Sequence, residues 1–397
     1  MNGARTPQLL PRIFGRCVHL SSRVKAAPNV SRISVDTVRW KSTAAASTMK
    51  GILCRTTGGT EVLEYTNLPI PTLKSGQVLI KNDYVGVNYI DVYARTGAYP
   101  SPKPEVLGKE GEGTVLALGP SGPDVTYHDI QIGDRVVWMG SGGYATHSAV
   151  PAETTYKIPD AVPPTVAVAS LFQGLTALTL VTESSHPKKG DWALVHAAGG
   201  GVGLWLCRLL KHFGVKVIGI VSGAAKWAEV EAAGADHVLD RSGEGFDLIA
   251  DVAKLTGVAS GGIDLVYDGV GRATWDMSLA VVRRKGSIVS FGATSGAVPN
   301  IPLSVLSAKN ITLARPTVFN YVTTREEFED YASRLFGMMI ENKWTPKIHS
   351  LYPLDQAPKA HQDLESRKTV GKLLLDTMLA GEAAPGSERA IRAARGE

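Results

Sequence analysis

Leu194-Val195-His196-Ala197-Ala198-Gly199-Gly200-Gly201-Val202-Gly203 is the stretch that decides the fold, and an apolar run at 204–213 follows it. This order predicts a buried strand, a glycine turn and a helix that ends at Gly214. A second strand is expected at residues 215–221. The chain therefore contains a βαβ unit, the building block of a doubly wound parallel sheet.

The glycine turn of this unit predicts nucleotide binding. Free N–H groups and the helix dipole attract a pyrophosphate to such a turn at a helix N-terminus. The spacing is Ala198-x-Gly200-x-x-Gly203, so an alanine replaces the first glycine of the dinucleotide fingerprint. A tight corner without a ligand is the alternative, and the flanking strands and helix favour the nucleotide.

The residues after the second strand predict which dinucleotide is bound. NAD-binding sites place an acid there for the ribose 2′-hydroxyl, whereas this chain has Ser222-Gly223-Ala224-Ala225-Lys226. Arg241 follows the next apolar segment, at 237–240. We expect Ser222, Lys226 and Arg241 to bind a 2′-phosphate, which favours NADPH by roughly 1.5–3 kcal/mol per charge-assisted hydrogen bond. The alternative is that both cations are solvated surface charges.

Composition limits the class of protein. A chain of 397 residues, 44% of them hydrophobic and 20% charged, has room for two domains and an ordinary soluble composition. No apolar run is expected to span a membrane. Cys17, Cys54 and Cys207 have no ligand spacing, and no histidine belongs to an HExxH pattern, so neither a disulfide framework nor a zinc site is expected.

The first 48 residues differ from the rest. They hold six arginines, two lysines and one acid, Asp36, which gives them a charge of +7 in a chain of net +5 and leaves −2 for the remainder. This composition predicts a mitochondrial transit peptide at 1–48 and a matrix location, with a disordered basic or RNA-binding tail as the alternative. Met49 could begin a cytosolic form. The near-neutral remainder argues against nucleic-acid binding.

Strands and helices are expected in two regions. Residues 50–159 are rich in short strand candidates between Gly/Pro turns, which indicates a small barrel or sandwich: 61–65, 77–81, 113–117 and 135–138. Later segments alternate, with helices expected at 163–181, 274–282 and 325–342, strands at 263–268, 287–292 and 371–377, and a disordered tail from Ala380. Strand-end residues 268–269 and 291–294 are expected beside the cofactor, or are ordinary turns.

One segment of the β-rich region is unusually polar and aromatic. Residues 86–99 are expected to leave a strand and enter a short helix, and they carry Asn88, Tyr89, Asp91, Tyr93, Arg95 and Tyr99. A capped helix with packing tyrosines is the alternative to a site.

Residues 49–378 closely resemble the NADPH:quinone oxidoreductases, or ζ-crystallin-like enzymes, of the medium-chain dehydrogenase/reductase superfamily. The resemblance lies in GVNYIDVYARTGAYP (86–100), LGKEGEG (107–113), GDRVV (133–137), FQGLT (172–176), HAAGGGVG (196–203), VYDGVG (266–271) and LESR (364–367). It implies an α/β fold with a discontinuous GroES-like β-rich catalytic domain at 49–171 and 314–380, a doubly wound Rossmann NADPH-binding domain at 172–313, and a disordered tail at 381–397.

The resemblance also implies site residues. Asn88, Tyr93 and Tyr99 would orient a quinone, and no side chain is identified as an essential acid. The cofactor contacts it implies are Asp91, Tyr93, Gly200, Gly201, Val202, Ser222, Lys226, Arg241, Gly269, Phe291, Gly292, Arg315 and Lys372. Arg241 departs from the tyrosine or histidine common at its position. A homodimer formed through the Rossmann sheets is expected.

The same resemblance implies that no metal is bound. Zinc alcohol dehydrogenases of the superfamily place Cys, His and Cys ligands where this chain has Asn88, Lys109 and Phe172-Gln173. Alcohol oxidation needs a Lewis acid, whereas a quinone is already electrophilic and needs positioning and donors near its oxygens. The alternatives are a zinc-free enal, enone or enoyl-thioester reductase and, more distantly, an NADPH-sensitive RNA-binding or structural protein.

Overall fold

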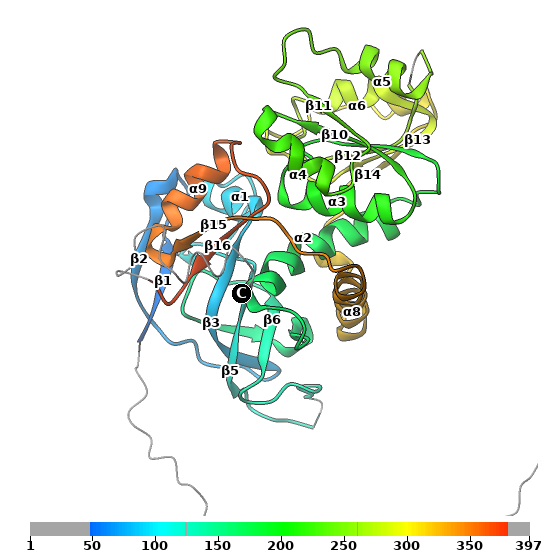
Figure 1. Ribbon diagram of the computed structural model, residues 1–397. Helices are drawn as coiled ribbons and strands as arrows, with labels where there is room; N and C mark the ends of the chain where they lie inside the picture. The colour runs from blue at the N-terminus through cyan, green and yellow to red at the C-terminus, as the bar shows by residue number, and fades with distance from the viewer. Residues whose placement is uncertain (1–47, 124, 260, 380–397) are drawn as a thin grey trace, which may run out of the picture. The chain divides into compact units, whose positions relative to one another are not determined.

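The computed structural model describes residues 48–123, 125–259 and 261–379, all within one compact unit. Two sheet systems with flanking helices make up this unit (Figure 1). The predicted transit peptide, apart from Thr48, and the predicted tail at 381–397 lie outside the described residues.

The predicted βαβ unit is present as β9 (Trp192–Val195), α3 (Gly201–His212) and β10 (Lys216–Val221). The helix begins at Gly201, three residues before the apolar run, because the last glycines of the turn already adopt helical geometry. Gly214 has a φ of 77°, a conformation that favours glycine, and so reverses the chain between helix and strand.

Six parallel strands form the sheet around this unit, in the order β11-β10-β9-β12-β13-β14. The further strands are β11 (His237–Asp240), β12 (Ile263–Asp268), β13 (Val282–Ser290) and β14 (Thr312–Ala314), with helices α4 (Trp227–Ala232), α5 (Leu248–Thr256), α6 (Trp275–Val281) and α7 (Ser304–Ser307). β13 starts earlier than predicted because Val282 pairs with Ile263. β10 and β11 are added on one side of β9, and β12, β13 and β14 on the other. The order of strand addition therefore reverses between β9 and β12, and folds of this kind bind ligands at such a point.

The β-rich part contains two sheets. A three-stranded sheet has the order β2-β1-β4, and a seven-stranded sheet has the order β15-β16-β3-β5-β6-β8 with β7 beside β3. The strands are β1 (Thr48–Cys54), β2 (Leu63–Pro69), β3 (Gln77–Val87), β4 (Glu105–Val106), β5 (Glu110–Leu118), β6 (Arg135–Met139), β7 (His147–Pro151), β8 (Thr155–Lys157), β15 (Ile348–Pro353) and β16 (Lys372–Asp376). The strand predicted at 61–65 starts only at Leu63, because the Glu61 carboxylate accepts from Gly59 N–H in a turn.

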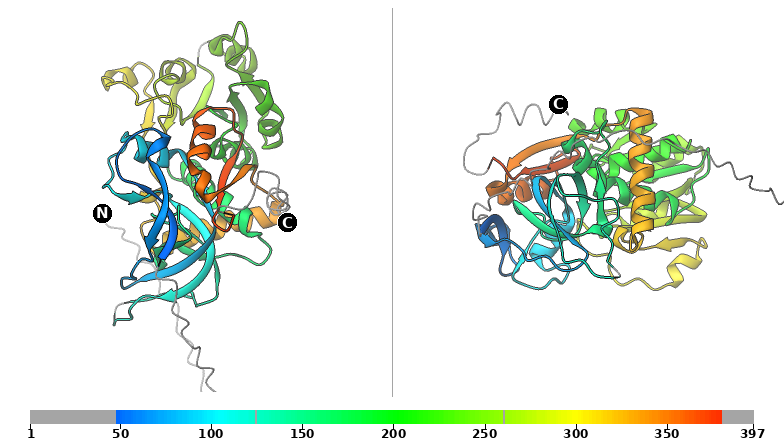
Figure 2. Two further views of the ribbon diagram at one scale, coloured as in Figure 1. Left: turned by 90° about the vertical axis from the view of Figure 1, so that its left-hand side faces the viewer. Right: turned by 90° about the horizontal axis from the view of Figure 1, so that it is seen from below.

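The end of the chain returns to the first sheet. β16 pairs antiparallel with β3, so the C-terminal strands β15 and β16 lie beside the N-terminal strands (Figure 2). Helix α9 (Ala357–Glu365) connects them, and α8 (Arg325–Asn342) precedes them with the bounds predicted from its amphipathic pattern. The β-rich part is therefore built from both ends of the described chain, with the parallel sheet inserted between.

Helix α2 (Pro164–Thr182) joins the two sheet systems. Among the described residues it is the one helix long and apolar enough to cross a membrane, which corrects the expectation that no apolar run reaches that length. Because 83% of its apolar stretch is buried, against α3, α8 and strands β5 and β6, its composition is that of a core helix.

Candidate active site

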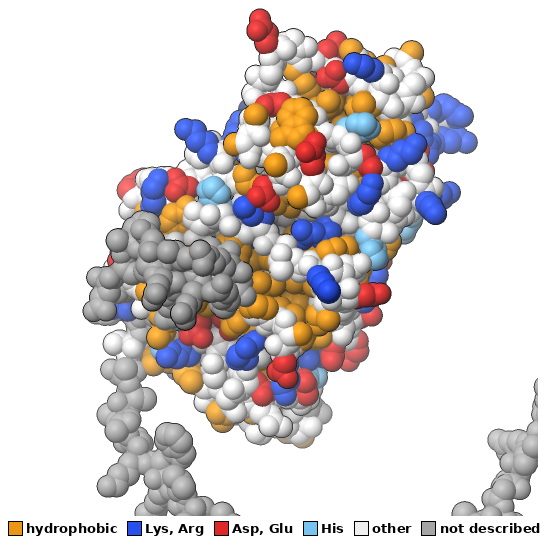
Figure 3. All heavy atoms as spheres, in the orientation of Figure 1, with side chains coloured by type: hydrophobic (Ala, Val, Ile, Leu, Met, Phe, Trp, Pro, Cys, Tyr) orange, Lys and Arg blue, Asp and Glu red, His pale blue; other side chains and the backbone are white. Residues whose placement is uncertain are grey.

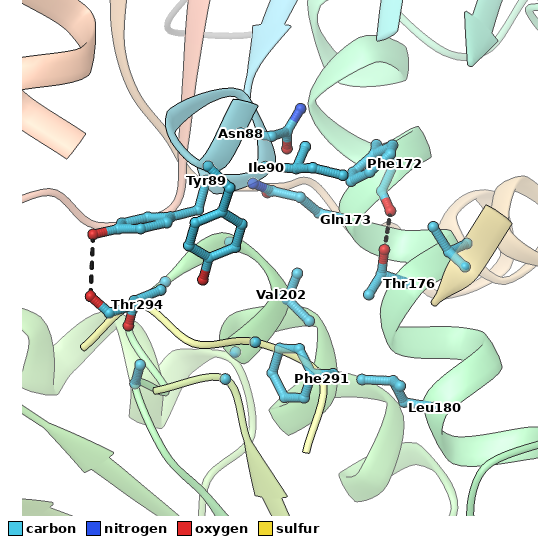
Figure 4. Close-up of a pocket in the computed structure, with 18 of the residues that line it drawn as sticks. Asn88, Tyr89, Ile90, Phe172, Gln173, Thr176, Leu180, Val202, Phe291 and Thr294 are labelled. Carbon is cyan, nitrogen blue, oxygen red and sulfur yellow. Dashed lines mark hydrogen bonds between the residues drawn. The ribbon is translucent and has the colours of Figure 1, made fainter. Parts of the chain in front are cut away.

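A cavity of about 450 Å³ opens at the carboxyl ends of β9 and β12. It lies between the parallel sheet and α1 (Tyr89–Thr96), the short helix that follows β3 (Figure 4). Its walls come from seven segments of the chain: Asn88, Tyr89, Ile90, Tyr93 and Tyr99; Phe172, Gln173, Thr176 and Leu180; His196, Ala197, Gly200, Gly201 and Val202; Gly269; Phe291, Gly292 and Thr294; residues 315–319; and Leu364, Thr369 and Gly371.

The glycine turn forms the floor at the start of α3. The N–H groups of Gly201, Val202 and Gly203 begin the helix and have no acceptor within it, so they are available to an anion. A Cβ on Gly201 would lie 1.8 Å from Gln173 Oε1, and one on Gly203 would lie 2.4 Å from Ala197 O. Close backbone packing therefore requires glycine at 203, whereas at 201 a side chain would displace the end of Gln173. The turn fits a dinucleotide pyrophosphate.

A loop from the end of the chain packs against this turn. Gly371 N–H donates to Gly199 O at 3.0 Å, and Gly371 and Gly200 form an isolated parallel bridge. The Nζ of Lys226 donates to Arg367 O at 2.6 Å, and its stem lies against Gly199, where a Cβ would approach Cδ to 2.9 Å. Residues 367–371 thus contact both the turn and the lysine expected to bind a 2′-phosphate.

None of the three residues expected at that phosphate lines the cavity, and of these Lys226 lies against the glycine turn. Ser222 is exposed after β10, and Arg241 follows β11 with its N–H on Val221 O. Burial lowers the pKa of Lys226. Asp240, the acid at the end of β11, accepts from Gly223 N–H and from Ser242, which holds its carboxylate in the local turn.

The strand-end loops after β12 and β13 form one wall. A Cβ on Gly269 would lie 2.8 Å from the Phe291 ring, and one on Gly292 would lie 2.5 Å from Gly269 O. Asp268 does not line the cavity, because its buried carboxylate accepts from Val270 N–H at 2.8 Å and from Gly271 N–H at 3.0 Å. This carboxylate holds the loop in the shape that brings the glycines to the cavity.

His196 is a cavity residue that sequence analysis did not single out. Its Nε2 lies 3.1 Å from Ser278 Oγ, and that hydroxyl donates to Asp268 Oδ2, so it accepts the proton that Nε2 carries. Nδ1 is buried and has no partner within the described part of the chain. Burial lowers the pKa of His196 to about 4, so the ring is neutral and offers Nδ1 as an acceptor. Its position at the end of β9 was the available signal.

Two phenols face the cavity with their protons free. Tyr93 Oη accepts from Ala293 N–H at 2.9 Å, and Tyr99 Oη accepts from Arg315 Nη2 at 3.0 Å. Burial raises the pKa of Tyr93 above its ordinary value. The two rings pack at 4.6 Å between centroids, and Tyr89 packs on Tyr93 at 5.2 Å. Each phenol can therefore donate to an acceptor in the cavity.

Two of the expected cofactor contacts, Asp91 and Lys372, lie behind the cavity wall. Asp91 is fully buried, and its Oδ2 accepts from Asn88 N–H at 2.9 Å and from Tyr144 Oη at 3.1 Å. Burial raises the pKa of Asp91 to about 6. Lys372 is also buried and pairs with Glu110. Neither residue lines the cavity. Both instead bind Asn88: Asp91, in the first turn of α1, accepts from its backbone N–H, and Lys372, in β16, donates to its side-chain oxygen.

Family models match two parts of the chain: an alcohol dehydrogenase GroES-like domain at 74–160 and a zinc-binding dehydrogenase at 201–337. A probable quinone oxidoreductase of Schizosaccharomyces pombe is 42% identical over 320 residues, which cover 80% of this chain and 94% of the relative. The chain belongs to the quinone oxidoreductase family. This confirms the resemblance seen in the sequence and the α/β fold with GroES-like and Rossmann domains.

Solved structures of this family agree with the fold described above. A mycobacterial protein in complex with NADPH superposes with a TM-score of 0.78 at 43% identity, covering 82% of this chain and 99% of its own. The Escherichia coli quinone oxidoreductase, also in complex with NADPH, superposes with a TM-score of 0.77 at 35% identity over 82% and 99% of the two chains.

The structure shows where Asn88, Lys109 and Gln173 lie, the residues that the resemblance places at the zinc-ligand positions of zinc alcohol dehydrogenases. Asn88 and Gln173 line the cavity, and Lys109 Nζ donates to Ser141 Oγ at 2.9 Å. Within residues 48–123, 125–259 and 261–379, no three His, Cys, Asp or Glu side chains cluster in a way that could hold a metal ion. Cys54 and Cys207 are buried and free.

Proposed function

We propose that this chain reduces quinones with NADPH, and the observation that carries the proposal is the arrangement of donors in the cavity. Tyr93, Tyr99 and the amide of Asn88 all line one space that continues onto the glycine turn. Hydrogen-bond donors preorganised around a carbonyl oxygen stabilise the negative charge that develops there during reduction. The family membership and the NADPH in two related structures support the same conclusion.

The chain's own groups fit the cofactor segment by segment. Gly201 to Gly203 would bind the pyrophosphate with their free N–H groups, and Lys226 would bind the 2′-phosphate. His196 lines the cavity, and its buried Nδ1 has no partner within the described part of the chain. NADPH supplies a hydride when bound.

The remaining residues orient the acceptor and exclude water. Phe172, Leu180 and Phe319 present apolar surface to the cavity, which packs against a flat ring and strengthens the nearby hydrogen bonds. The phenols of Tyr93 and Tyr99 would donate to the quinone oxygens, because their own oxygens already accept from Ala293 N–H and Arg315. The reduced acceptor then takes its proton from solvent.

An acceptor panel tests this function. Purified protein is assayed with NADPH and with NADH against a benzoquinone, a naphthoquinone, an enone and an enoyl thioester, each at equal concentration. We expect the quinones to give the highest kcat/KM and NADPH to be preferred. Faster turnover of the enone or the thioester than of any quinone would refute the proposal in favour of the other zinc-free reductases, and electron paramagnetic resonance would detect one-electron products.

We further propose import into the mitochondrial matrix and assembly into a homodimer. The basic, acid-poor residues 1–48 support import, and fusion of this segment to a reporter tests it by microscopy. β14 is one of the two edge strands of the parallel sheet, and an edge strand can pair with a strand of a second copy. Light scattering of the purified protein measures the assembly, and a monomeric mass would refute it.

RNA binding is the less favoured role. Residues 49–397 carry a net charge of −2, and Figure 3 shows acidic and basic side chains interspersed over the face that it displays. Nucleic-acid binding depends on a continuous basic surface. A salt-dependent mobility shift with RNA would support that role.

A further inference from the structure

The amide of Asn88 is held by two buried side chains of opposite charge. Its Nδ2 donates to Glu110 Oε1 at 2.8 Å, and its Oδ1 accepts from Lys372 Nζ at 2.8 Å. Lysine has only donors and an ionised carboxylate only acceptors, so these partners fix which end of the amide is oxygen and which is nitrogen. The orientation of Asn88 is therefore determined by Glu110 and Lys372.

The two partners form an ion pair of their own. Lys372 Nζ lies 2.5 Å from Glu110 Oε1, and the two side chains are 1% and 0% exposed. The second carboxylate oxygen of Glu110 accepts from Phe172 N–H at 3.1 Å, at a point where α2 lines the cavity. Lys372 comes from β16 and Glu110 from β5, so two strands and a helix meet at this pair.

Only Asn88 of these three residues reaches the cavity. Its carbonyl oxygen accepts from Lys372, and one of its two Nδ2 hydrogens goes to Glu110. The second Nδ2 hydrogen is the polar group that the amide has left to offer. Lys372 also polarises the amide, because a cation on the oxygen makes the N–H groups stronger donors.

We propose that the Glu110–Lys372 pair is a positioning device that makes Asn88 a hydrogen-bond donor toward the cavity, so that the site selects acceptors with carbonyl oxygens. This inference rests on the proposed function, because it concerns the acceptor of that reaction. Glu110 and Lys372 do not touch the acceptor and act through Asn88. If the pair had a purely structural role, any variant that kept the fold and the NADPH affinity would also keep full quinone activity.

A charge-neutral double variant separates these two roles. Glu110→Gln/Lys372→Met removes both charges together, which avoids leaving one buried charge without its partner. We expect a fold shown intact by circular dichroism, an unchanged Kd for NADPH, and about a tenfold lower kcat/KM for a naphthoquinone. Lys103→Met/Glu105→Gln removes another partly buried pair, beneath α1 and without contact to Asn88, and is expected to retain full activity.

A double-mutant cycle assigns the effect to Asn88. Asn88→Ala alone should lose about tenfold in kcat/KM, and adding Glu110→Gln/Lys372→Met to it should cost nothing more, because the pair has no amide left to orient. Full quinone activity in the charge-neutral variant, or losses that multiply in the combined variant, would overturn the proposal.

A charge-conserving exchange provides a second, independent test. Asn88→Asp/Glu110→Gln keeps one carboxylate beside Lys372 and the same net charge, but it gives the cavity an acceptor in place of a donor. We expect this variant to fold and bind NADPH and to lose quinone reduction at least as much as Asn88→Ala does. Quinone activity equal to that of the unmodified protein would overturn the proposal. If the unmodified protein itself fails to reduce quinones, the proposed function fails instead.

Discussion

Replacing Lys226 with alanine removes the ammonium that is expected to bind the 2′-phosphate of NADPH. A charge-assisted hydrogen bond contributes roughly 1.5–3 kcal/mol. Lys226 Nζ is partly buried and already donates to Arg367 O at 2.6 Å. Binding a phosphate therefore replaces this hydrogen bond to a neutral carbonyl with a stronger one to an anion. The net loss should lie at the lower end, about 1.5 kcal/mol, which raises the KM for NADPH about tenfold.

The assay compares both nicotinamide cofactors. KM and Kd are measured for NADPH and NADH with one quinone; Lys226→Ala should change the NADPH values and leave those for NADH as they were. Burial lowers the pKa of Lys226, so this ammonium loses its proton at a lower pH than an exposed lysine does. The preference for NADPH over NADH should therefore fall as the pH rises through the pKa of Lys226. Lys216→Ala, at the start of β10 and away from the glycine turn, is the control. An unchanged ratio of NADPH to NADH efficiency would refute the assignment.

The remaining predictions concern the phenols, the glycine turn and a buried acid. Tyr93→Phe and Tyr99→Phe should each lower kcat/KM for quinones roughly tenfold with little change in NADPH Kd, since each removes one donor; unchanged efficiency would contradict this. Gly201→Ala should weaken NADPH binding measured by calorimetry, because its Cβ would meet Gln173 Oε1 at 1.8 Å and displace the end of that side chain, and Gln173→Ala should restore part of it. Burial raises the pKa of Glu112 from 4.5 to about 8, so its contribution to stability is present below pH 4.5 and is lost as pH rises through 8. Glu112→Gln should therefore raise the Tm relative to the unmodified protein more at pH 8.5 than at pH 5, and an equal shift at both would contradict the reasoning.

The sequence predicted the elements whose signals are local. The strand, turn and helix around 194–213 and the amphipathic helix at 325–342 follow from periodicity and glycine spacing within one window, and both are present. The segment at 86–99 was singled out by its own composition, and four of its polar and aromatic side chains, Asn88, Tyr89, Tyr93 and Tyr99, line the cavity.

What the sequence could not provide are contacts between distant segments. Lys372 and Glu110 are 262 positions apart, so their pairing depends on β16 returning to β3. Asp91 was expected at the cofactor because residues next to it in the sequence were expected there. Its position in the first turn of α1 instead directs its carboxylate to Asn88 N–H and Tyr144 Oη. His196 was passed over because one histidine at a strand end has no pattern to distinguish it.

The loop at 367–371 has a consequence for the order in which the protein matures. The parallel sheet and its glycine turn are complete once residue 314 has been made, but Gly371, which bonds to Gly199, and Arg367, which holds Lys226, emerge from the ribosome later. A nascent chain can thus assemble its nucleotide fold early and still lack part of the wall against which the nucleotide rests. Translation products that end before residue 367 are therefore expected to bind the nucleotide more weakly than the finished polypeptide, and to gain less stability from it.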